Sequence, residues 1–324
     1  MGVFVETRHI PILTLDNDIH GALVQHTLAN QRGITCHLIS VDRICDVSSA
    51  TWSNDLEHGF HPTIVSDDGV QVRPADLHVV WWRRSNPPQI VPGEIVDKTH
   101  IDLIRNDCHA TVTGLFANEF AGKWINAIDA SRSAENKLIQ LCAAERAGFR
   151  VPRTLISNDP AKIRAFCRLL DHRVVVKAVQ GTSGCHLFTK VVTEQHLEHD
   201  DCLRLSPAIY QELVPGDRHL RVHCFGDHVH PVAIRSQELD WRVDLDVPFE
   251  AASIDFETRH KLRTVLQLLG LRMGVVDLKL SPEGIPVWLE INPQGQFLFS
   301  EALSGLDLTA EFAAFLTREA MGTA

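Results

Sequence analysis

The segment from Gly274 to Pro293 constrains the fold more than any other part of the 324-residue chain. Two runs rich in valine, leucine and isoleucine flank Ser281–Gly284, a sequence that is typical of a tight turn. The segment therefore predicts a β-hairpin, whose side chains alternate between two faces. A loop of two or four residues would place Leu280 opposite Ile285.

The same register gathers polar side chains on one face of the hairpin. With Asp277 opposite Trp288, one face holds Asp277, Lys279, Glu290 and Asn292. The other face is apolar and holds Val276, Leu278, Val287, Leu289 and Ile291. Carboxylate and amide oxygens suit Mg²⁺, which completes its shell with water and substrate phosphates. An odd-numbered loop would move Asp277 to the other face, and a solvated face neutralised by Lys279 is the alternative interpretation.

Two lysines lie in separate predicted elements. A helix expected to begin at Ser131 or Ser133 and to end at Gly148 carries Lys137. Lys177 ends an apolar strand that begins at Val174. Lysine is rare in a buried strand unless its ammonium group meets an anion or a carboxylate, so a phosphate is a suitable partner. Gly181–Gly184 predicts a hairpin tip whose backbone N–H groups could close over that phosphate. An exposed hairpin turn explains the same glycines.

A break in a further apolar strand indicates a hinge. Pro215 and Gly216 interrupt the strand that begins near Ile209. The peptide groups of an extended hinge can hydrogen-bond the edge of a planar base, and Asp217 or His219 could reach a sugar. A plain linker with surface charges is the alternative.

The N-terminal part alternates strands and helices, which predicts a mostly parallel sheet. Ligands collect at the carboxyl ends of such strands, where residues 16–20 and the pair Arg83 and Arg84 lie. We favour a contact between these arginines and a substrate carboxylate over a solvated charge pair. The expected organisation is an α/β domain over residues 1–124 and two α+β modules over 125–215 and 216–324.

Composition narrows the class of protein. Hydrophobic residues make up 44% and charged residues 22%, which are ordinary globular values. The net charge of −10 argues against nucleic-acid binding through bulk charge. No apolar run approaches the ~20 residues that span a bilayer, so no membrane segment is expected. The eight cysteines are scattered, which favours a reducing compartment, and we expect a cytoplasmic protein.

The order of these residues resembles the ATP-grasp carboxylate–amine ligases. The resemblance rests on Lys137, Lys177, Gln211–Val214, Arg221, Arg235, Asp277 and the Glu290-x-Asn292 pair. Three further motifs are more similar to the peptide maturases that macrocyclise microviridins and other graspetides: Trp81–Arg84, Asp240–Arg242 and Leu289–Phe297. The resemblance spans nearly the whole chain. It implies an ATP-grasp fold in which an N-terminal parallel-sheet domain precedes two modules that clasp ATP.

The resemblance also implies a role for each residue. ATP would be bound by Lys137, Lys177, Gln211, Glu212, Leu213, Val214 and Asp217, the last at the ribose. Mg²⁺ would be bound by Asp277, Glu290 and Asn292. Arg235 and Arg221 would stabilise the phosphate and the tetrahedral intermediate as catalytic residues. Substrate would be bound by Arg83, Arg84 and Arg242. This chain has His219 where relatives commonly have an acidic residue.

The activity implied is that of an ADP-forming peptide macrocyclase. It would activate Asp or Glu side chains of a precursor peptide, leader plus core, as acyl phosphates and form ω-ester or ω-amide links. A homodimer is also implied. One alternative is a ligase that joins an amino acid or small amine to a peptide or metabolite carboxylate. Another is a nucleotide-binding regulatory module without turnover, against which the intact lysine and carboxylate set argues.

Overall fold

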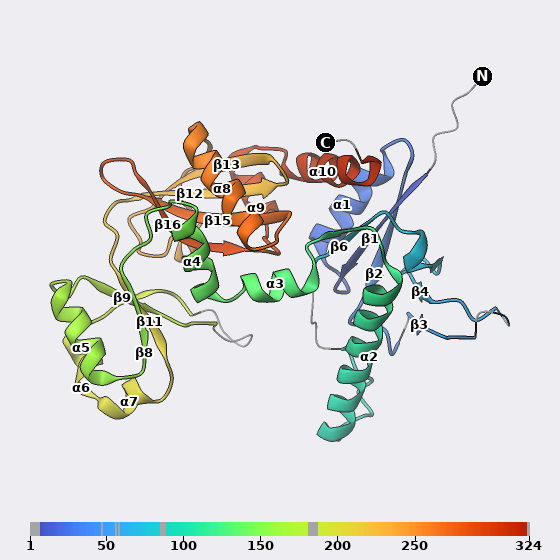
Figure 1. The fold of residues 1–324 in the computed structure, drawn as a ribbon, viewed down its shortest axis with the longest axis horizontal. Coiled ribbons are helices and arrows are strands. Elements are labelled where there is room, and N and C mark those ends of the chain that lie inside the picture. The colour runs from blue at the N-terminus through green and yellow to red at the C-terminus, as the bar shows by residue number, and fades with distance from the viewer. Residues whose placement is uncertain are drawn as a thin grey trace. The chain divides into compact units, whose positions relative to one another are not determined.

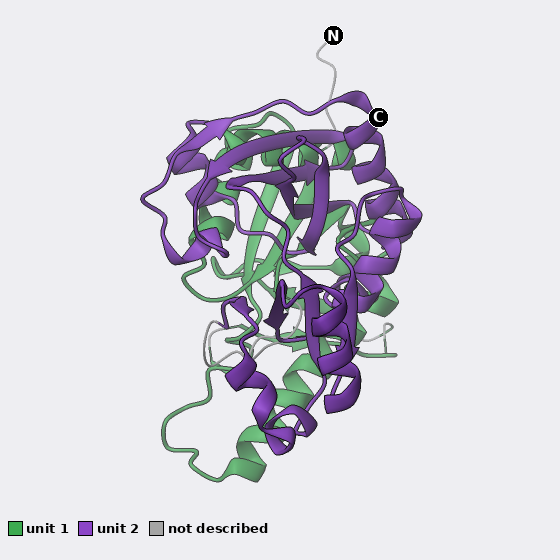
Figure 2. Cartoon of the chain, turned by 90° about the vertical axis from the view of Figure 1, so that its left-hand side faces the viewer, with its two compact units in different colours: residues 1–128, 307–324 green, residues 129–306 purple. Residues whose placement is uncertain are grey.

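The computed structural model describes residues 7–46, 48–55, 57, 59–84, 89–180 and 187–322. The chain forms two compact units (Figures 1 and 2): unit 1 is residues 1–128 and 307–324, and unit 2 is residues 129–306. The C-terminal helix therefore belongs to unit 1, although its position in the sequence placed it in the last predicted module. The predicted boundaries at 124/125 and 215/216 stay predictions. The expected hairpin tip at Gly181–Gly184 lies outside the described residues.

Unit 1 is built on a four-stranded parallel sheet, as the alternation of strands and helices predicts. Its strand order is β2 (Ile34–Ser40), β1 (Arg8–Thr14), β6 (Val79–Trp82) and β7 (Lys123–Ile125). A small antiparallel sheet of β3 (Ala50–Thr51), β4 (Thr63–Val65) and β5 (Gln71–Val72) and a 3₁₀ turn (Pro74–Asp76) lie between β2 and β6 in sequence.

Helices cover both faces of this parallel sheet. Trp81 contacts Phe312 of α10 (Leu308–Met321) with ring centroids 4.6 Å apart. Its neighbour Trp82 points to the other face and contacts Phe116 of α2 (Lys98–Glu119) at 5.6 Å. The remaining helix, α1 (Ile19–Ala29), packs against α10. Burial on both faces explains why β6 is apolar throughout.

Unit 2 contains a four-stranded antiparallel sheet, which we call the lid sheet. Its order is β10 (Lys190–Val191), β9 (Val174–Lys177), β11 (Ala208–Glu212) and β8 (Thr154–Ser157). Its helices are α5 (Pro160–Leu169), α6 (Glu194–Glu198) and α7 (Asp200–Arg204). The expected antiparallel pairing of the strands on either side of the Gly-rich segment is confirmed between β9 and β10.

The second sheet of unit 2 has five antiparallel strands, and we call it the carboxylate sheet. Its order is β14 (Phe249–Ala251), β13 (His228–Arg235), β12 (Arg218–Phe225), β15 (Met273–Leu280) and β16 (Pro286–Asn292). One face packs on α4 (Lys137–Arg146) and α8 (Phe256–Leu268) through a buried core that includes Val222, Leu278 and Trp288. The unit also contains α3 (Ile128–Ala134), a 3₁₀ turn (Trp241–Val243) and α9 (Leu298–Ser304).

The predicted helix over residues 131–148 is two helices. The first, α3, ends at Ala134, and α4 begins at Lys137. The break occurs because the Asn136 side chain accepts a hydrogen bond from the backbone N–H of Leu138, 3.0 Å away, which is a standard helix start. Gly148, in the left-handed region at φ 85°, follows the helix end as expected. Lys137 is therefore the first residue of a helix.

Candidate active site

A β-bulge sets the pairing of the two carboxylates. The loop between β15 and β16 is odd-numbered, because Leu280 pairs with Pro286 rather than Ile285. That register alone would put Asp277 and Glu290 on opposite faces. It shifts by one residue at Leu289, so Asp277 pairs directly with Glu290.

The bulge produces the predicted polar face, although the sequence pattern did not predict a bulge. Asp277, Lys279, Glu290 and Asn292 share one face, as predicted. The predicted pairing of Asp277 with Trp288 is wrong, because Trp288 pairs with Leu278 and lies in the core. The predicted apolar-face position of Val287 is also wrong, because it pairs with Lys279.

Asp277 is held by an arginine from the neighbouring strand. Arg221 on β12 is the register partner of Asp277, and its Nη1 lies 2.9 and 2.8 Å from the two carboxylate oxygens. Both side chains are buried, and the guanidinium also lies over the ring of Trp241, at 5.6 Å from its centroid. Burial raises the pKa of Asp277 above its ordinary value, and the nearby charge of Glu290 adds to the rise, whereas Arg221 opposes both.

Glu290 is the centre of a cationic cluster. Its Oε2 accepts a hydrogen bond from Lys137 Nζ at 2.9 Å, and its Oε1 lies 3.6 Å from Arg242 Nη1. Burial would raise the pKa of Glu290, but Lys137, Arg242 and Lys177 outweigh it and lower the pKa to about 2. Glu290 is therefore ionised throughout the physiological range.

Arg242 is oriented by a residue that the predicted set left out. Asp240 accepts two hydrogen bonds from its guanidinium, Nε to Oδ1 at 2.8 Å and Nη2 to Oδ2 at 2.7 Å. This two-point contact fixes the plane of the arginine. The acid-x-Arg spacing around Trp241 was visible in the sequence, but nothing in it showed that Asp240 would turn back onto Arg242.

Lys177 approaches the same cluster from the lid sheet. It is the last residue of β9 and is half-buried. Burial lowers the pKa of Lys177 to about 8, with Glu290 opposing the shift and Lys137 adding to it. The charge of this lysine therefore changes in the range just above neutral pH.

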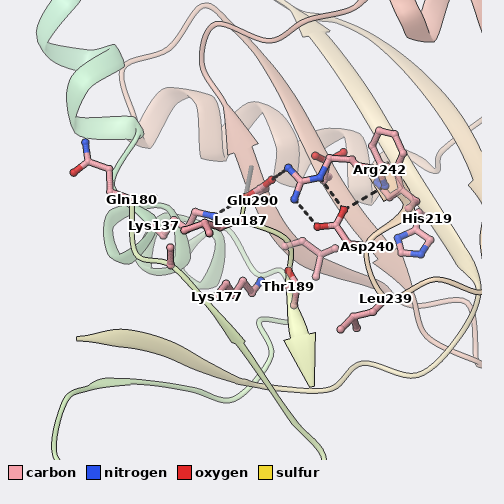
Figure 3. Close-up of a pocket in the computed structure, with 14 residues that line it drawn as sticks. Lys137, Lys177, Gln180, Leu187, Thr189, His219, Leu239, Asp240, Arg242 and Glu290 are labelled. Atoms are coloured by element: carbon pink, nitrogen blue, oxygen red, sulfur yellow. Dashed lines mark hydrogen bonds and ion pairs between the residues drawn. The ribbon is translucent and has the colours of Figure 1, made fainter. Parts of the chain in front are cut away.

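These groups line one cavity of about 230 Å³ within unit 2 (Figure 3). Its walls include Lys137, Lys177, Asp240, Arg242, Asp277 and Glu290. Figure 3 shows the contacts of Glu290 and Asp240 with the cations running across it. The volume lies below the ~300–1,000 Å³ of typical small-molecule sites.

Five of the residues predicted to bind ATP do not line this cavity. Gln211 is buried and donates to Thr154 Oγ1 at 2.9 Å, and Glu212 pairs with Arg150 at 3.0 Å. Glu212 and Leu213 instead line a separate cavity of about 200 Å³. Two more predicted residues, Val214 and Asp217, line neither of these two cavities. Val214 is buried, and the backbone oxygen of Asp217 accepts a hydrogen bond from the backbone N–H of Ser236. Their contact with ATP stays a prediction.

Two other predicted residues do not line the first cavity. Asn292 is exposed at the end of β16, and its Oδ1 accepts from the backbone N–H of Gln294. The register places Arg235 on the opposite face of the carboxylate sheet from Asp277, at a second cavity of about 560 Å³. Both cavities are lined by His219, whose ring nitrogens have no hydrogen-bond partner among the described residues.

The two arginines predicted to bind substrate from unit 1 differ in burial. Arg83 is 1% exposed and forms an ion pair with Asp18, the residue that caps α1. A substrate contact by Arg83 would require this pair to open. Arg84 is half-buried and is the better placed of the two. Both contacts stay predictions.

The donor set fits Mg²⁺. Among the described residues, no three histidine, cysteine or acidic side chains gather into a metal-binding group. Mg²⁺ needs only one or two protein carboxylates, because water and phosphate oxygens complete its octahedron. Asp277 and Glu290, paired across two strands and facing one cavity, match that requirement.

The strand order and layers define an ATP-grasp fold, as predicted. The chain superposes on macrocyclase MdnC of Microcystis aeruginosa MRC, bound there to precursor peptide MdnA, with a TM-score of 0.85 and 23% identity, covering 95% of this chain and 99% of MdnC. It also superposes on the ATP-grasp ligase PsnB, complexed there with a minimal-precursor variant, Mg and ADP, at a TM-score of 0.78 and 22% identity, covering 97% and 99%. The predicted resemblance is thus confirmed in the fold.

Sequence comparison also finds a ligase. The chain is 28% identical over 213 residues to the α-aminoadipate–LysW ligase LysX of Sulfurisphaera tokodaii, covering 62% of this chain and 74% of LysX. No model of a known protein family matches it. In the described part of the chain, no helix has the length and apolar character needed to cross a bilayer.

Proposed function

We propose that the protein is an ATP- and Mg²⁺-dependent ligase that cross-links side chains of a ribosomal precursor peptide. It would activate an Asp or Glu carboxylate as an acyl phosphate and form an ω-ester or ω-amide link. The observation that carries the proposal is the meeting of two lysines, Arg242 and two carboxylates in one cavity of an ATP-grasp fold. MdnC and PsnB, which share the fold, were each solved with a precursor peptide.

The cations of the cavity suit a polyphosphate. Lys137 and Lys177 enter from different elements, α4 and β9, and would contact the phosphates of ATP from two sides. Glu290 is the partner of Lys137 and Arg242 in this structure. A phosphate would replace it as the partner of these cations, which frees its oxygens to bind metal.

Asp277, Glu290 and Asn292 would hold Mg²⁺. When bound, the metal neutralises phosphate charge and positions the transferred group. Arg221 holds the Asp277 carboxylate through a single nitrogen, so lone pairs of both carboxylate oxygens stay available for a metal. The bulge at Leu289 is what places the two acidic ligands on one face.

The chemistry balances in two steps. The substrate carboxylate displaces ADP from the γ-phosphorus, which gives an acyl phosphate. A Ser or Thr hydroxyl or a Lys amine of the same peptide then attacks the acyl carbon, and phosphate leaves as the nucleophile loses its proton. The net change in the peptide is the loss of one water per link. Arg242, fixed by Asp240, supplies positive charge beside the reacting phosphate.

A second candidate function is favoured by the likeness to LysX. The name of that protein describes a ligase that joins α-aminoadipate to LysW. The same cavity would then activate a carboxylate of one partner for attack by a separate amine. The homodimer implied by the resemblance stays a prediction for either function.

Mass spectrometry distinguishes these functions. The chain is incubated with ATP, Mg²⁺ and a synthetic peptide rich in Thr, Ser, Asp and Glu, taken from a short reading frame beside its gene. Loss of one water per link with equimolar ADP supports the macrocyclase. A mass gain that depends on an added amino acid supports the LysX-like function. Mg·ATP binding without either product across a broad substrate panel contradicts both.

A further inference from the structure

A buried glutamine joins the helix that carries Lys137 to the strand that carries Glu290. Gln140 lies on α4, one turn after Lys137, and is only 3% exposed. Its amide nitrogen donates to the backbone oxygen of Ile291 at 2.9 Å, and its amide oxygen accepts from the backbone N–H of Ile291 at 3.0 Å. The same nitrogen also donates to the backbone oxygen of Ala134, the last residue of α3, at 2.6 Å.

These contacts use the amide fully. Glutamine offers two N–H donors and a carbonyl acceptor, and all three have a backbone partner here. Ile291 belongs to β16, which is an edge strand of the carboxylate sheet. The glutamine amide therefore takes the place of the peptide group of a neighbouring strand and pairs the Ile291 peptide, while the backbone oxygen of Arg150 pairs with the N–H of Trp288 further along β16.

The position of the bonded peptide matters for chemistry. Ile291 lies between Glu290 and Asn292, two of the residues predicted to bind Mg²⁺. Lys137 and Gln140 are three residues apart and so lie on one side of α4. Two links therefore connect α4 to β16: the Lys137–Glu290 ion pair at 2.9 Å and the Gln140–Ile291 amide pair.

Under the proposed function, one of these two contacts opens when ligands bind and the other stays in place. The Lys137–Glu290 pair must open when phosphate and metal enter, whereas nothing in that exchange requires Gln140 to move. We propose that Gln140 is a positioning residue that holds α4 against β16, so that Lys137 and Glu290 keep their spacing while they change partners. The expected effect on nucleotide binding rests on the proposed function, whereas the contact between Gln140 and Ile291 does not depend on it.

The experiment uses the full chain and two measurements. Gln140→Met removes all three hydrogen bonds with little change in side-chain length. Hydrogen exchange of the Ile291 amide without ligand reports the contact, and calorimetry with Mg·ADP reports its consequence. We expect exchange of Ile291 to be about 10-fold faster or more, and the Kd for Mg·ADP to be about 10-fold higher, because buried hydrogen bonds of this kind contribute on the order of 1 kcal/mol each.

Two variants separate positioning from general loss of stability. Val265→Ala removes buried volume from α8 in the same core and leaves the three Gln140 hydrogen bonds in place. It should lower Tm and leave the Kd for Mg·ADP unchanged. Gln140→Glu keeps the acceptor, and a buried carboxyl group titrates at raised pH, so the protonated form can both donate and accept. Its Kd should approach that of the wild type at about pH 5.5 and rise towards pH 8 more than in Gln140→Met.

The outcomes are distinct. Unchanged Ile291 exchange in Gln140→Met would overturn the contact. Faster exchange with an unchanged Kd would overturn its positioning role and leave a purely structural one. If the wild-type chain does not bind Mg·ADP, the proposed function fails and the positioning role fails with it, while the exchange measurement still decides whether the contact exists.

Discussion

Two buried arginine–aspartate pairs, one in each unit, look alike and behave differently. In unit 1 Arg83 pairs with Asp18 and lies over the ring of Trp81, 5.4 Å from its centroid. In unit 2 Arg221 pairs with Asp277 and lies over the rings of Trp241 and Phe299. Residue types and burial are therefore the same in both pairs.

The surroundings of the two carboxylates differ. Asp18 also accepts hydrogen bonds from the Thr14 hydroxyl and from the backbone N–H of His20. Although burial alone would raise the pKa of Asp18, the contacts with His20, Arg83 and Thr14 hold it well below its ordinary value. Asp277 has Arg221 as its cation but faces a second carboxylate, Glu290, and its pKa is raised. A carboxylate such as Asp18, whose charge is balanced by its hydrogen-bond partners, stabilises the fold. A carboxylate such as Asp277, which faces a second carboxylate, is suited to bind a metal ion.

The largest expected effect tests this difference through stability. Arg83→Met leaves an ionised Asp18 buried without its cation, and we expect the free energy of unfolding to fall by about 3–5 kcal/mol. Arg221→Met should lower it by only about 1–3 kcal/mol, because Asp277, whose pKa is already raised, can take up a proton when its cation is removed. Urea denaturation measures both, with Arg43→Met at the half-exposed pair with Asp46 as a control that should change the free energy of unfolding little. Equal losses at Arg83 and Arg221 would contradict the comparison.

The pH dependence of the first pair has a defined sign. The pKa of Asp18 is lowered on folding, so its contribution is complete above its ordinary value of 3.8. That contribution is lost as the pH falls below this value. The destabilisation caused by Asp18→Asn should therefore be constant near neutral pH and should shrink in acid.

The next effect concerns turnover. Glu290→Gln removes one metal-binding charge, and we expect ligation to fall by about 100-fold or more, equivalent to about 2.7 kcal/mol. The fold should survive, because Lys137 and Arg242 are partly exposed and can be hydrated. Glu257→Gln, which removes a surface pair with Lys261, is the matched control. Near-normal ligation by Glu290→Gln at ordinary Mg²⁺ concentrations would exclude the metal role.

More of the fold than of the candidate site could be predicted from the sequence. Alternating apolar strands and helices predict the parallel sheet of unit 1, because strands buried on both faces must be apolar throughout. The turn at Ser281–Gly284 predicts the β15–β16 hairpin. Neither pattern contains the bulge at Leu289, because a bulge is a property of paired strands and one leucine in an apolar run does not reveal it. The shared face of Asp277 and Glu290 was predicted from the wrong register.

Side-chain partners were the least predictable part. The Arg83 motif shows charge at the end of a strand, but not that Asp18, 65 residues away, would occupy it. Gln140 gave no signal, since a glutamine in a polar helix looks like surface until the strand beside it is known. Long-range contacts of this kind depend on packing between elements, which no local pattern encodes.

The smallest expected effect concerns Lys177, whose pKa of about 8 lies close to physiological pH. Its pKa of about 8 means that it carries charge mainly below that pH, so phosphate binding should weaken above it. In the wild type the Kd for Mg·ADP should rise between pH 7 and pH 9. Lys177→Met should bind about 10-fold more weakly at pH 7 and show a flat profile, because one charge-assisted contact contributes about 1.5–3 kcal/mol.

Although Lys177→Met should weaken binding of Mg·ADP, it should make the fold more stable. A lowered lysine pKa means that folding disfavours the charged form, and this penalty is present below about pH 8 and relieved as the pH rises towards 10.5. Lys177→Met should therefore raise the free energy of unfolding at pH 7, by an amount that shrinks towards pH 10. Lys190→Met on the exposed edge strand β10 is the control and should show neither change. A pH-independent gain would mean that the pKa of Lys177 is not lowered on folding, and would contradict its titration near pH 8.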